Sequence, residues 1–231
     1  AGCPVLVILS DVPTFGYRSK EIKNGLAMPP RMTLQNIFQI IGRPNWAINT
    51  LIHGQPSFQI MKPYMDKRMN MHHLGQFMNR TFNGRLNEDK VAAIRDMWKG
   101  KLVIKGVASE IDAEKSVRLG LDGIIISNHG GRQLDAGPST IETLHPIVAK
   151  YGDKIKVMMD SGMRSGPDIA RTLACGAQFT FMGRSFMYGA AALGKEGGNH
   201  TITILKRQLT QVLDQVCCDK VSDLPKRLIR E

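Results

Sequence analysis

The stretch GIIISNHGGRQLD, residues 123–135, places a short apolar segment directly before a histidine and an arginine. The segment Gly123 to Ile126 has the composition of a strand that is buried on both faces. His129 and Arg132 follow its carboxyl end, which is where catalytic side chains collect in proteins built of βα repeats. The stretch therefore predicts both an α/β fold and a site at the end of this strand.

The chemistry of these two side chains suits a small acid as the ligand. An imidazole titrates near neutral pH and can remove a proton from a substrate, so His129 is a candidate base. A guanidinium binds a carboxylate through two parallel hydrogen bonds, which makes Arg132 a candidate ligand for a substrate carboxylate. Alternatively, His129 caps a turn and Arg132 is a solvated surface charge. The flanking glycines and the rest of the chain favour the first interpretation.

Strand and helix signals alternate with short loops from residue 100 onward, and one further strand precedes them. Such alternation is typical of parallel strands joined by right-handed crossovers. The predicted strands are Val5 to Leu9, Leu102 to Ile104, Gly123 to Ser127, Lys156 to Asp160 and Gln178 to Met182. The predicted helices are Ser109 to Leu119, Ser139 to Lys150, Pro167 to Ala174, Ser185 to Leu193 and Thr201 to Gln215.

Five strands that each end in a polar or glycine residue are the pattern of an α/β protein with a (β/α)₈ barrel, or TIM barrel. The chain would supply about the last five βα units, three strands short of closure. A doubly wound sheet is the alternative, but the sequence lacks the nucleotide fingerprint that follows the first strand of such sheets. We expect residues 1–231 to form a single partial barrel domain with a basic helical excursion at about residues 25–85.

Two glycine-rich turns after the late strands predict a phosphate site. They are DSGMRSG, residues 160–166, and GRS, residues 183–185. Glycines let backbone amides approach an anion, helix N-termini carry partial positive charge, and Arg164 and Arg184 add guanidinium donors. The loops after the seventh and eighth strands are the usual phosphate site of such barrels. Either turn taken alone could be purely structural.

Lys105 closes a predicted strand directly before Gly106. One interpretation is that it points into the mouth of the barrel, where its charge would stabilise electron density on a cofactor ring. The other is an ordinary surface lysine on a loop.

The composition is that of an ordinary globular protein, with 42% hydrophobic residues in a chain of 231. No apolar run approaches the roughly 20 residues that span a bilayer, and no secretion signal is evident, so secretion is not expected. The four cysteines lack metal-ligand spacing, and two of them, Cys217 and Cys218, are adjacent. We expect reduced cysteines, no metal and a cytoplasmic location.

The net charge of +11 is concentrated between residues 12 and 87, which carry about +8 of it. This segment has no zinc, helix-turn-helix or aromatic RNA-binding signature, so nucleic acid is not expected as a partner. An anionic membrane surface, at the inner face of the cell membrane, is the better candidate, because apolar side chains that could enter an interface are interspersed. They are Trp46, Phe58, Met61, Tyr64, Met65, Met69, Met71 and Met78. A helical excursion packed on its own protein, with solvated lysines, explains the pattern equally well.

Several motifs together resemble the FMN-dependent L-2-hydroxy-acid oxidases and dehydrogenases, a family that includes bacterial L-lactate and mandelate dehydrogenases. The motifs are VIKG at 103–106, SNHGGRQLD at 127–135, DSGMRSG at 160–166, GR at 183–184 and DVPTFGYR at 11–18. The resemblance extends through essentially the whole chain.

The resemblance implies FMN as the cofactor and a role for each matching residue. His129 would be the base, Asp11 the carboxylate that orients it and favours its protonated form, and Lys105 a catalytic cation beside the flavin N1 and O2 edge. Arg132 would be the main ligand of the substrate carboxylate, and Arg18 a second, more mobile one. The implied FMN-binding residues are Lys105, Ser127, Asp160, Gly162, Arg164, Gly183 and Arg184.

The resemblance also implies a reaction and partners. The first choice of substrate is L-lactate, oxidised to pyruvate, with mandelate or glycolate behind it, and the enzyme would be a homo-oligomer, as a tetramer. The methionine-rich basic excursion favours a quinone or another membrane acceptor for the electrons. An oxygen-using oxidase and an inactive fragment or interaction module are the alternatives. Whether hydride transfer or a carbanion carries the reaction stays open.

The chain departs from the family pattern in two respects. Leu9 stands where the family usually has a threonine that contacts the flavin, and Ser10 faces the other side of the strand. The family's first three barrel strands have no counterpart here, so we expect this polypeptide to be part of a longer enzyme. Alone, it should aggregate and bind FMN weakly, because an open parallel sheet exposes unpaired backbone groups and core side chains.

Overall fold

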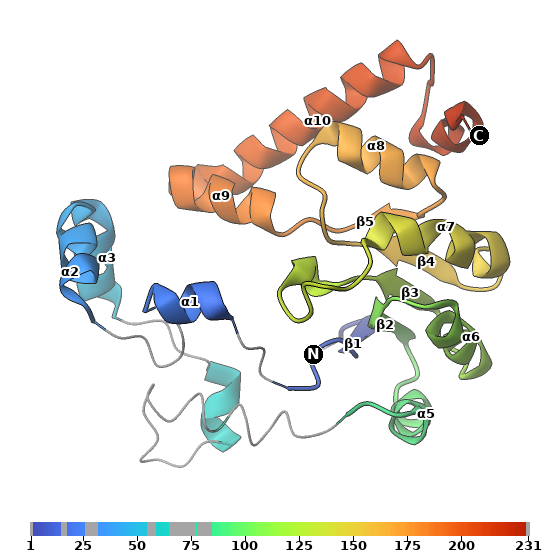
Figure 1. The fold of residues 1–231 in the computed structure, drawn as a ribbon, viewed down its shortest axis with the longest axis horizontal. Helices are drawn as coiled ribbons and strands as arrows, with labels where there is room; N and C mark the ends of the chain where they lie inside the picture. The colour runs from blue at the N-terminus through green and yellow to red at the C-terminus, as the bar shows by residue number, and fades with distance from the viewer. Residues whose placement is uncertain are drawn as a thin grey trace. The chain divides into compact units, whose positions relative to one another are not determined.

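The computed structural model describes residues 2–14, 18–25, 32–54, 59–64, 77 and 85–229. They fall into two compact units, one made of residues 1–12 and 85–231 and the other of residues 13–84. The two units are described separately below, and Figure 1 labels their helices and strands.

The first unit contains a sheet of five parallel strands in the order β1-β2-β3-β4-β5 (Figure 1). The strands are β1 (Val5–Leu9), β2 (Lys101–Val107), β3 (Gly123–Ile126), β4 (Lys156–Met159) and β5 (Phe179–Thr180). A doubly wound sheet reverses its strand order at a switch point, whereas the described strands follow one another in sequence order. The five predicted strands and the barrel prediction are therefore confirmed, with the chain supplying an arc of a TIM-barrel fold.

β3 and β4 each end one residue earlier than predicted, and two strands differ from the prediction by more than that. β2 continues past Lys105 to Val107, because a register irregularity at Gly106, with φ +102°, lets the ladder to β3 resume beyond it. β5 has only two residues, although the backbone N–H groups of Gln178 and Phe181 also bond to β4 carbonyls, at 2.8 and 2.9 Å. The apolar pattern located both strands, but it does not report such changes in backbone direction.

Four helices cover one face of the sheet and bury its core. They are α5 (Glu88–Met97), α6 (Glu110–Arg118), α7 (Thr140–Tyr151) and α8 (Gly166–Ala174). Ser109 caps α6, and Ser139 and Ser165 form capping boxes at α7 and α8. The fully buried side chains between helices and sheet include Leu102, Ile124, Ile126, Leu144, Ile147 and Val157.

The remaining elements of this unit follow β3 and β5. They are the 3-10 helix η2 (His129–Gly131), α9 (Arg184–Leu193), η3 (Gly194–Glu196), α10 (Gly197–Gln215) and η4 (Val221–Arg227). α10 lies along α8 and α9 (Figure 1). The backbones of α9 and α10 meet at Gly189 and Gly197, where an added Cβ on Gly197 would lie 2.1 Å from the Gly189 carbonyl oxygen.

The opposite face of the sheet is the inner face of the barrel arc. Leu9, Lys105, Ile125, Met158 and Phe179 stand in register across the five strands and so share this face. At its edges Leu9 is 50% and Phe179 is 56% exposed. The inner face of the arc thus carries exposed apolar side chains at both edge strands.

The second unit contains α1 (Ser19–Lys23), α2 (Leu34–Ile41), α3 (Pro44–His53) and the 3-10 helix η1 (Gln59–Tyr64). Phe38 on α2 is 71% exposed and Leu51 on α3 is 83% exposed. Some residues of the predicted membrane face lie outside the described residues, namely Arg31, Phe58, Met65, Lys67, Arg68, Met69, Met71, Met78 and Arg80. In the part of the chain that is described, no helix combines the length and the apolarity needed to cross a bilayer.

Candidate active site

Lys105 is the centre of the predicted site and lies in β2, two residues before its carboxyl end at Val107. Its Nζ lies 2.7 Å from the Ser127 Oγ, 3.1 Å from the Asp160 Oδ2 and 3.5 Å from the Asp11 Oδ2. These partners come from the ends of β3, β4 and β1, which parallel pairing brings to one edge of the sheet. The Lys105 side chain is only 19% exposed, so water screens these interactions little.

His129 lies beside Asp11 within the same cluster. The Nδ1 of His129 is 3.2 Å from the Asp11 Oδ2, which leaves Nε2 as the ring nitrogen away from the carboxylate. His129 has φ +55°, an uncommon value for a residue with a side chain, and its backbone N–H donates to the Ser127 Oγ at 3.1 Å. A strained backbone held by a buried serine is a feature typical of functional sites.

Ser161 was not anticipated from the sequence, although it joins two loops of the site. Its Oγ donates to the Asp160 Oδ1 at 2.8 Å and accepts from the backbone N–H of Gly130 at 3.0 Å. Its φ is +74°, so it holds the loops after β3 and β4 together through a strained conformation. No pattern in the sequence indicates a positive φ at a serine. The position of Ser161 next to Asp160 was the only sign in the sequence that it lies near the site.

Arg164 and Arg184 reach the site from the segments that follow β4 and β5. Arg184 donates to the Gly130 carbonyl at 3.1 Å, and the Arg164 guanidinium stands 5.6 Å from the centre of the Tyr188 ring. Ser185 connects the two turns, because its Oγ donates to the Arg164 carbonyl at 3.1 Å. The two glycine-rich turns that the sequence singled out are therefore adjacent.

Asp168 fixes the first of these turns. Its Oδ2 accepts the backbone N–H groups of Arg164 and Ser165, both at 3.0 Å, and the Ser165 hydroxyl at 2.7 Å. Burial alone raises the pKa of Asp168, but these hydrogen bonds, from the Ser165 hydroxyl first, outweigh burial and lower the pKa overall. The carboxylate form therefore holds the turn that carries Arg164.

A cavity of about 310 Å³ connects these groups. Phe181, Met182 and Met187 add an apolar wall to it. The predicted site residues that line it are Lys105, His129, Arg132, Asp160, Gly162, Arg164, Gly183 and Arg184. The histidine, the lysine and three arginines thus face one space, which is large enough for part of a cofactor and a small acid.

Asp11 and Ser127, two of the predicted site residues, do not line this cavity, although both contact Lys105. Three other residues named in the sequence analysis also lie outside it. Ser10 bonds to the Lys105 carbonyl and lines a different cavity, as expected for a residue on the other side of the strand. Leu9 stands on the inner face of the arc, where it offers no hydroxyl. Arg18 belongs to the second unit, at the N-terminus of α1, and its role stays a prediction; Phe15, Gly16 and Tyr17 of the same motif lie outside the described residues.

The donor set of the cavity fits an FMN phosphate and ribityl chain. At Gly162 and Gly183 no described atom lies within 4 Å of an added Cβ, so the backbone there is open to a ligand. The N-terminus of α9 begins at Gly183 and has no side-chain cap among the described residues, which leaves its N–H groups to an anion. Arg164 and Arg184 supply the neutralising charge beside it, and Asp160 supplies an acceptor for hydroxyl groups.

Comparison with known proteins agrees with this reading. The profile of a family described as FMN-dependent dehydrogenase matches residues 1–231. An L-lactate dehydrogenase from Haemophilus influenzae (strain PittEE) is 34% identical over 231 residues, which is 99% of this chain and 60% of the relative. The (S)-mandelate dehydrogenase of Pseudomonas putida is 34% identical over 96% of this chain and 56% of its own length.

A solved structure gives the same picture. The crystal structure of the monotopic membrane protein (S)-mandelate dehydrogenase has a TM-score of 0.91 and 34% identity, and it covers 100% of this chain and 61% of that chain. This chain therefore spans a little more than half the length of the proteins that it matches.

Proposed function

Because this chain belongs to the FMN-dependent dehydrogenase family, we propose that it is the catalytic part of an FMN-dependent L-2-hydroxy-acid dehydrogenase. The observation that carries the proposal is the cluster in which Lys105 contacts Ser127, Asp11 and Asp160 while His129 contacts Asp11. Arg132 lines the same cavity as Lys105 and His129, so a candidate base, a largely buried cation and a candidate carboxylate ligand lie close together, which supports oxidation of a bound acid.

In this reaction the chain's residues bind the acid and move its proton. Arg132 binds the substrate carboxylate in two parallel hydrogen bonds, with Arg18 as a second ligand. His129 takes the proton at Nε2, since its Nδ1 faces Asp11 at 3.2 Å. The Asp11 carboxylate stabilises the imidazolium that results and keeps the ring oriented. FMN, when bound, supplies the acceptor for the two electrons.

The same residues that line the cavity would hold the cofactor. Arg164, Arg184 and the N-terminus of α9 would bind the phosphate, and Asp160 would accept hydrogen bonds from the ribityl hydroxyls. Gly162 and Gly183 let the backbone approach. Lys105, whose Nζ donates to the Ser127 Oγ at 2.7 Å, would stabilise negative charge on a bound flavin.

L-lactate, oxidised to pyruvate, is the substrate that we propose first, followed by mandelate and glycolate. Support comes from the relatives named for lactate and mandelate. Stopped-flow reduction of the full-length enzyme by a panel of L-2-hydroxy acids, without oxygen, tests both the proposed reaction and the proposed substrate. Reduction of the flavin by L-lactate with the highest kcat/KM supports the lactate assignment, and no reduction by any member of the panel contradicts the function.

We further propose that the excursion binds an anionic membrane surface from the cytoplasmic side, where electrons pass to a quinone. Phe38 and Leu51 present exposed apolar side chains, and the basic residues Lys20, Lys23 and Arg43 of the same unit are exposed as well. A related enzyme is described as a monotopic membrane protein. Flotation with anionic liposomes at low salt tests the membrane proposal, and reduction of a quinone against reduction of oxygen tests the acceptor. Rapid turnover with oxygen alone would favour the oxidase instead.

The catalytic unit is proposed to be a single barrel domain that three further strands complete and that assembles into a tetramer. The exposed inner-face side chains Val5, Val7 and Leu9 at the β1 edge support the completion. Light scattering of the full-length enzyme tests the assembly. A monomer under conditions of full activity would contradict it.

A further inference from the structure

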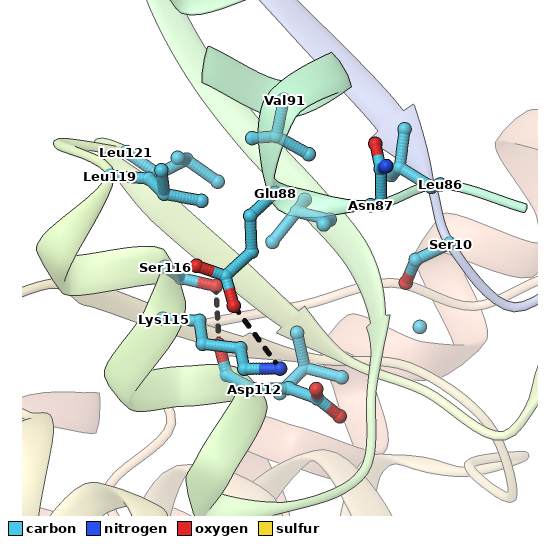
Figure 2. A pocket seen from close by; sticks show the side chains of 13 residues that line it. Ser10, Leu86, Asn87, Glu88, Val91, Asp112, Lys115, Ser116, Leu119 and Leu121 are labelled. Carbon is cyan, nitrogen blue, oxygen red and sulfur yellow. Dashed lines mark hydrogen bonds and ion pairs between the residues drawn. The ribbon is translucent and has the colours of Figure 1, made fainter.

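A second cavity of about 440 Å³ lies on the helix side of the sheet, at the ends of β1 and β2. Ser10 and Gly106 line it together with residues of α5 and α6, among them Glu88 and Lys115 (Figure 2). In Figure 2 the side chain of Ser10 projects from the end of β1 at the margin of this space. Ser10 is thus a neighbour of Asp11 in sequence, while its own side chain faces away from the catalytic cavity.

Ser10 makes two hydrogen bonds to one atom of the site. Its backbone N–H and its Oγ both donate to the carbonyl oxygen of Lys105, each at 2.8 Å. A carbonyl oxygen has two lone pairs, so this single residue fills the acceptor capacity of Lys105. The bonds join the first residue after β1 to β2 at the point where Leu9 and Lys105 are paired in register.

Gly106, the residue after Lys105 in β2, also contacts the segment that follows β1. Its φ of +102° is one that side chains rarely allow, and an added Cβ would lie 2.5 Å from the Cβ of Asp11. Asp11 therefore rests directly on the Gly106 backbone. Ser10, Asp11, Lys105 and Gly106 interlock, so a shift in one backbone moves both the aspartate and the lysine.

The lysine tolerates little displacement at this junction. Its Nζ has partners at 2.7, 3.1 and 3.5 Å on three other elements, and the position of its Cα decides which of them it reaches. The flexible four-carbon stem of lysine does not fix the ammonium by itself. The pairing of β2 with β1 and β3 fixes the backbone of Lys105, and the Ser10 hydroxyl adds a further hydrogen bond at its carbonyl.

We propose that Ser10 is a positioning residue, whose hydroxyl holds the Lys105 backbone so that the ammonium of Lys105 stays in its place in the catalytic cavity and in contact with the carboxylate of Asp11. This inference rests on the proposed function for its effect on turnover. Its effect on the flavin, through Lys105, does not depend on which acid is the substrate.

A matched pair of variants tests the hydroxyl, namely Ser10→Thr and Ser10→Val in the full-length holoenzyme. The two side chains have nearly the same shape, and the adjoining cavity has room for the added methyl group. Only threonine keeps the donor. We expect Ser10→Thr to match the wild type. Ser10→Val should lower the affinity for reduced relative to oxidised flavin about tenfold, which is about 30 mV in the two-electron potential. Its flavin reduction by substrate should slow about tenfold.

Equal potentials for Ser10→Thr and Ser10→Val would overturn the proposal. The potential is measured by equilibration with a reference dye, without substrate, so it decides the role of Ser10 even if no L-2-hydroxy acid reduces the wild type. Failure of every L-2-hydroxy acid to reduce the wild-type flavin would contradict the proposed function but not the proposed role of Ser10. If Ser10→Val gives no soluble holoenzyme, Ser10→Ala is compared with the wild type by the same measurement, and an unchanged potential in Ser10→Ala overturns the proposal.

Discussion

The Nζ of Lys105 lies 3.1 Å from the Oδ2 of Asp160, so an ion pair inside the cavity joins β2 to the loop after β4. The two side chains are 19% and 18% exposed. A charge pair that is largely removed from water depends on both partners, because loss of one leaves the other charge uncompensated.

Lys105→Met should therefore damage both stability and chemistry. It leaves the carboxylates of Asp11 and Asp160 without their shared cation, at a cost of about 2–3 kcal/mol in the free energy of unfolding. Flavin reduction should slow by about 10²–10³-fold, as expected when a stabilising group is removed from developing charge. Lys154→Met, at an exposed position, is the control. Reduction within about threefold of the wild type would remove Lys105 from the mechanism.

His129→Gln should abolish reduction of the flavin by L-lactate and leave FMN bound, because the cavity keeps its phosphate ligands but loses its base. Single-turnover stopped-flow measures the reduction, and protein-bound flavin absorbance measures the binding. His145→Gln changes an exposed histidine on α7 and should have no effect. An unchanged rate in His129→Gln would show that another group takes the proton.

Arg164→Ala and Arg184→Ala should each raise the Kd for FMN by about 10–100-fold, the range of one charge-assisted hydrogen bond. Fluorescence quenching of free FMN during titration measures the Kd. Arg118→Ala removes an arginine on α6 that is 63% exposed and is the control. If both variants keep the wild-type Kd, the phosphate lies elsewhere.

Asp122 should stabilise the fold in a pH-dependent manner. The hydrogen bond from Lys101 lowers the pKa of Asp122 against the effect of burial, with the Leu102 N–H and Arg95 adding to it. A lowered pKa stabilises the folded state above the unfolded pKa of about 3.9, and this contribution is lost as the pH falls through the folded pKa.

Asp122→Asn should accordingly lower the free energy of unfolding by about 1–2 kcal/mol at neutral pH, and the difference should shrink below about pH 4. Urea unfolding of the holoenzyme at both pH values measures it, with Asp153→Asn at an exposed site as the control. A deficit that is the same at both pH values would contradict the electrostatic explanation.

The positions of the strands could be read from the sequence because burial on both faces requires continuous apolar runs, as in Gly123 to Ile126. The lengths of β2 and β5 could not, because the irregularity at Gly106 and the last hydrogen bonds of β5 depend on the neighbouring strand. Likewise, the residue types of His129, Lys105 and Arg164 indicated their chemistry. The roles of Ser10 and Ser161 could not be predicted from the sequence, because the role of a serine hydroxyl depends on the atom with which it forms a hydrogen bond.

The sequence by itself determined the order and kind of the elements and which charged residues stand at the strand ends, because periodicity and glycine-rich turns are local properties of a chain. Only the tertiary structure decided which of those residues meet. Asp11 and His129 are far apart along the chain, yet 3.2 Å separates the Asp11 Oδ2 from the His129 Nδ1. Parallel pairing of consecutive strands places their carboxyl ends at one edge. That register, set by packing between the sheet and its helices, makes one cavity from Lys105 of β2 and the segments that follow β3, β4 and β5.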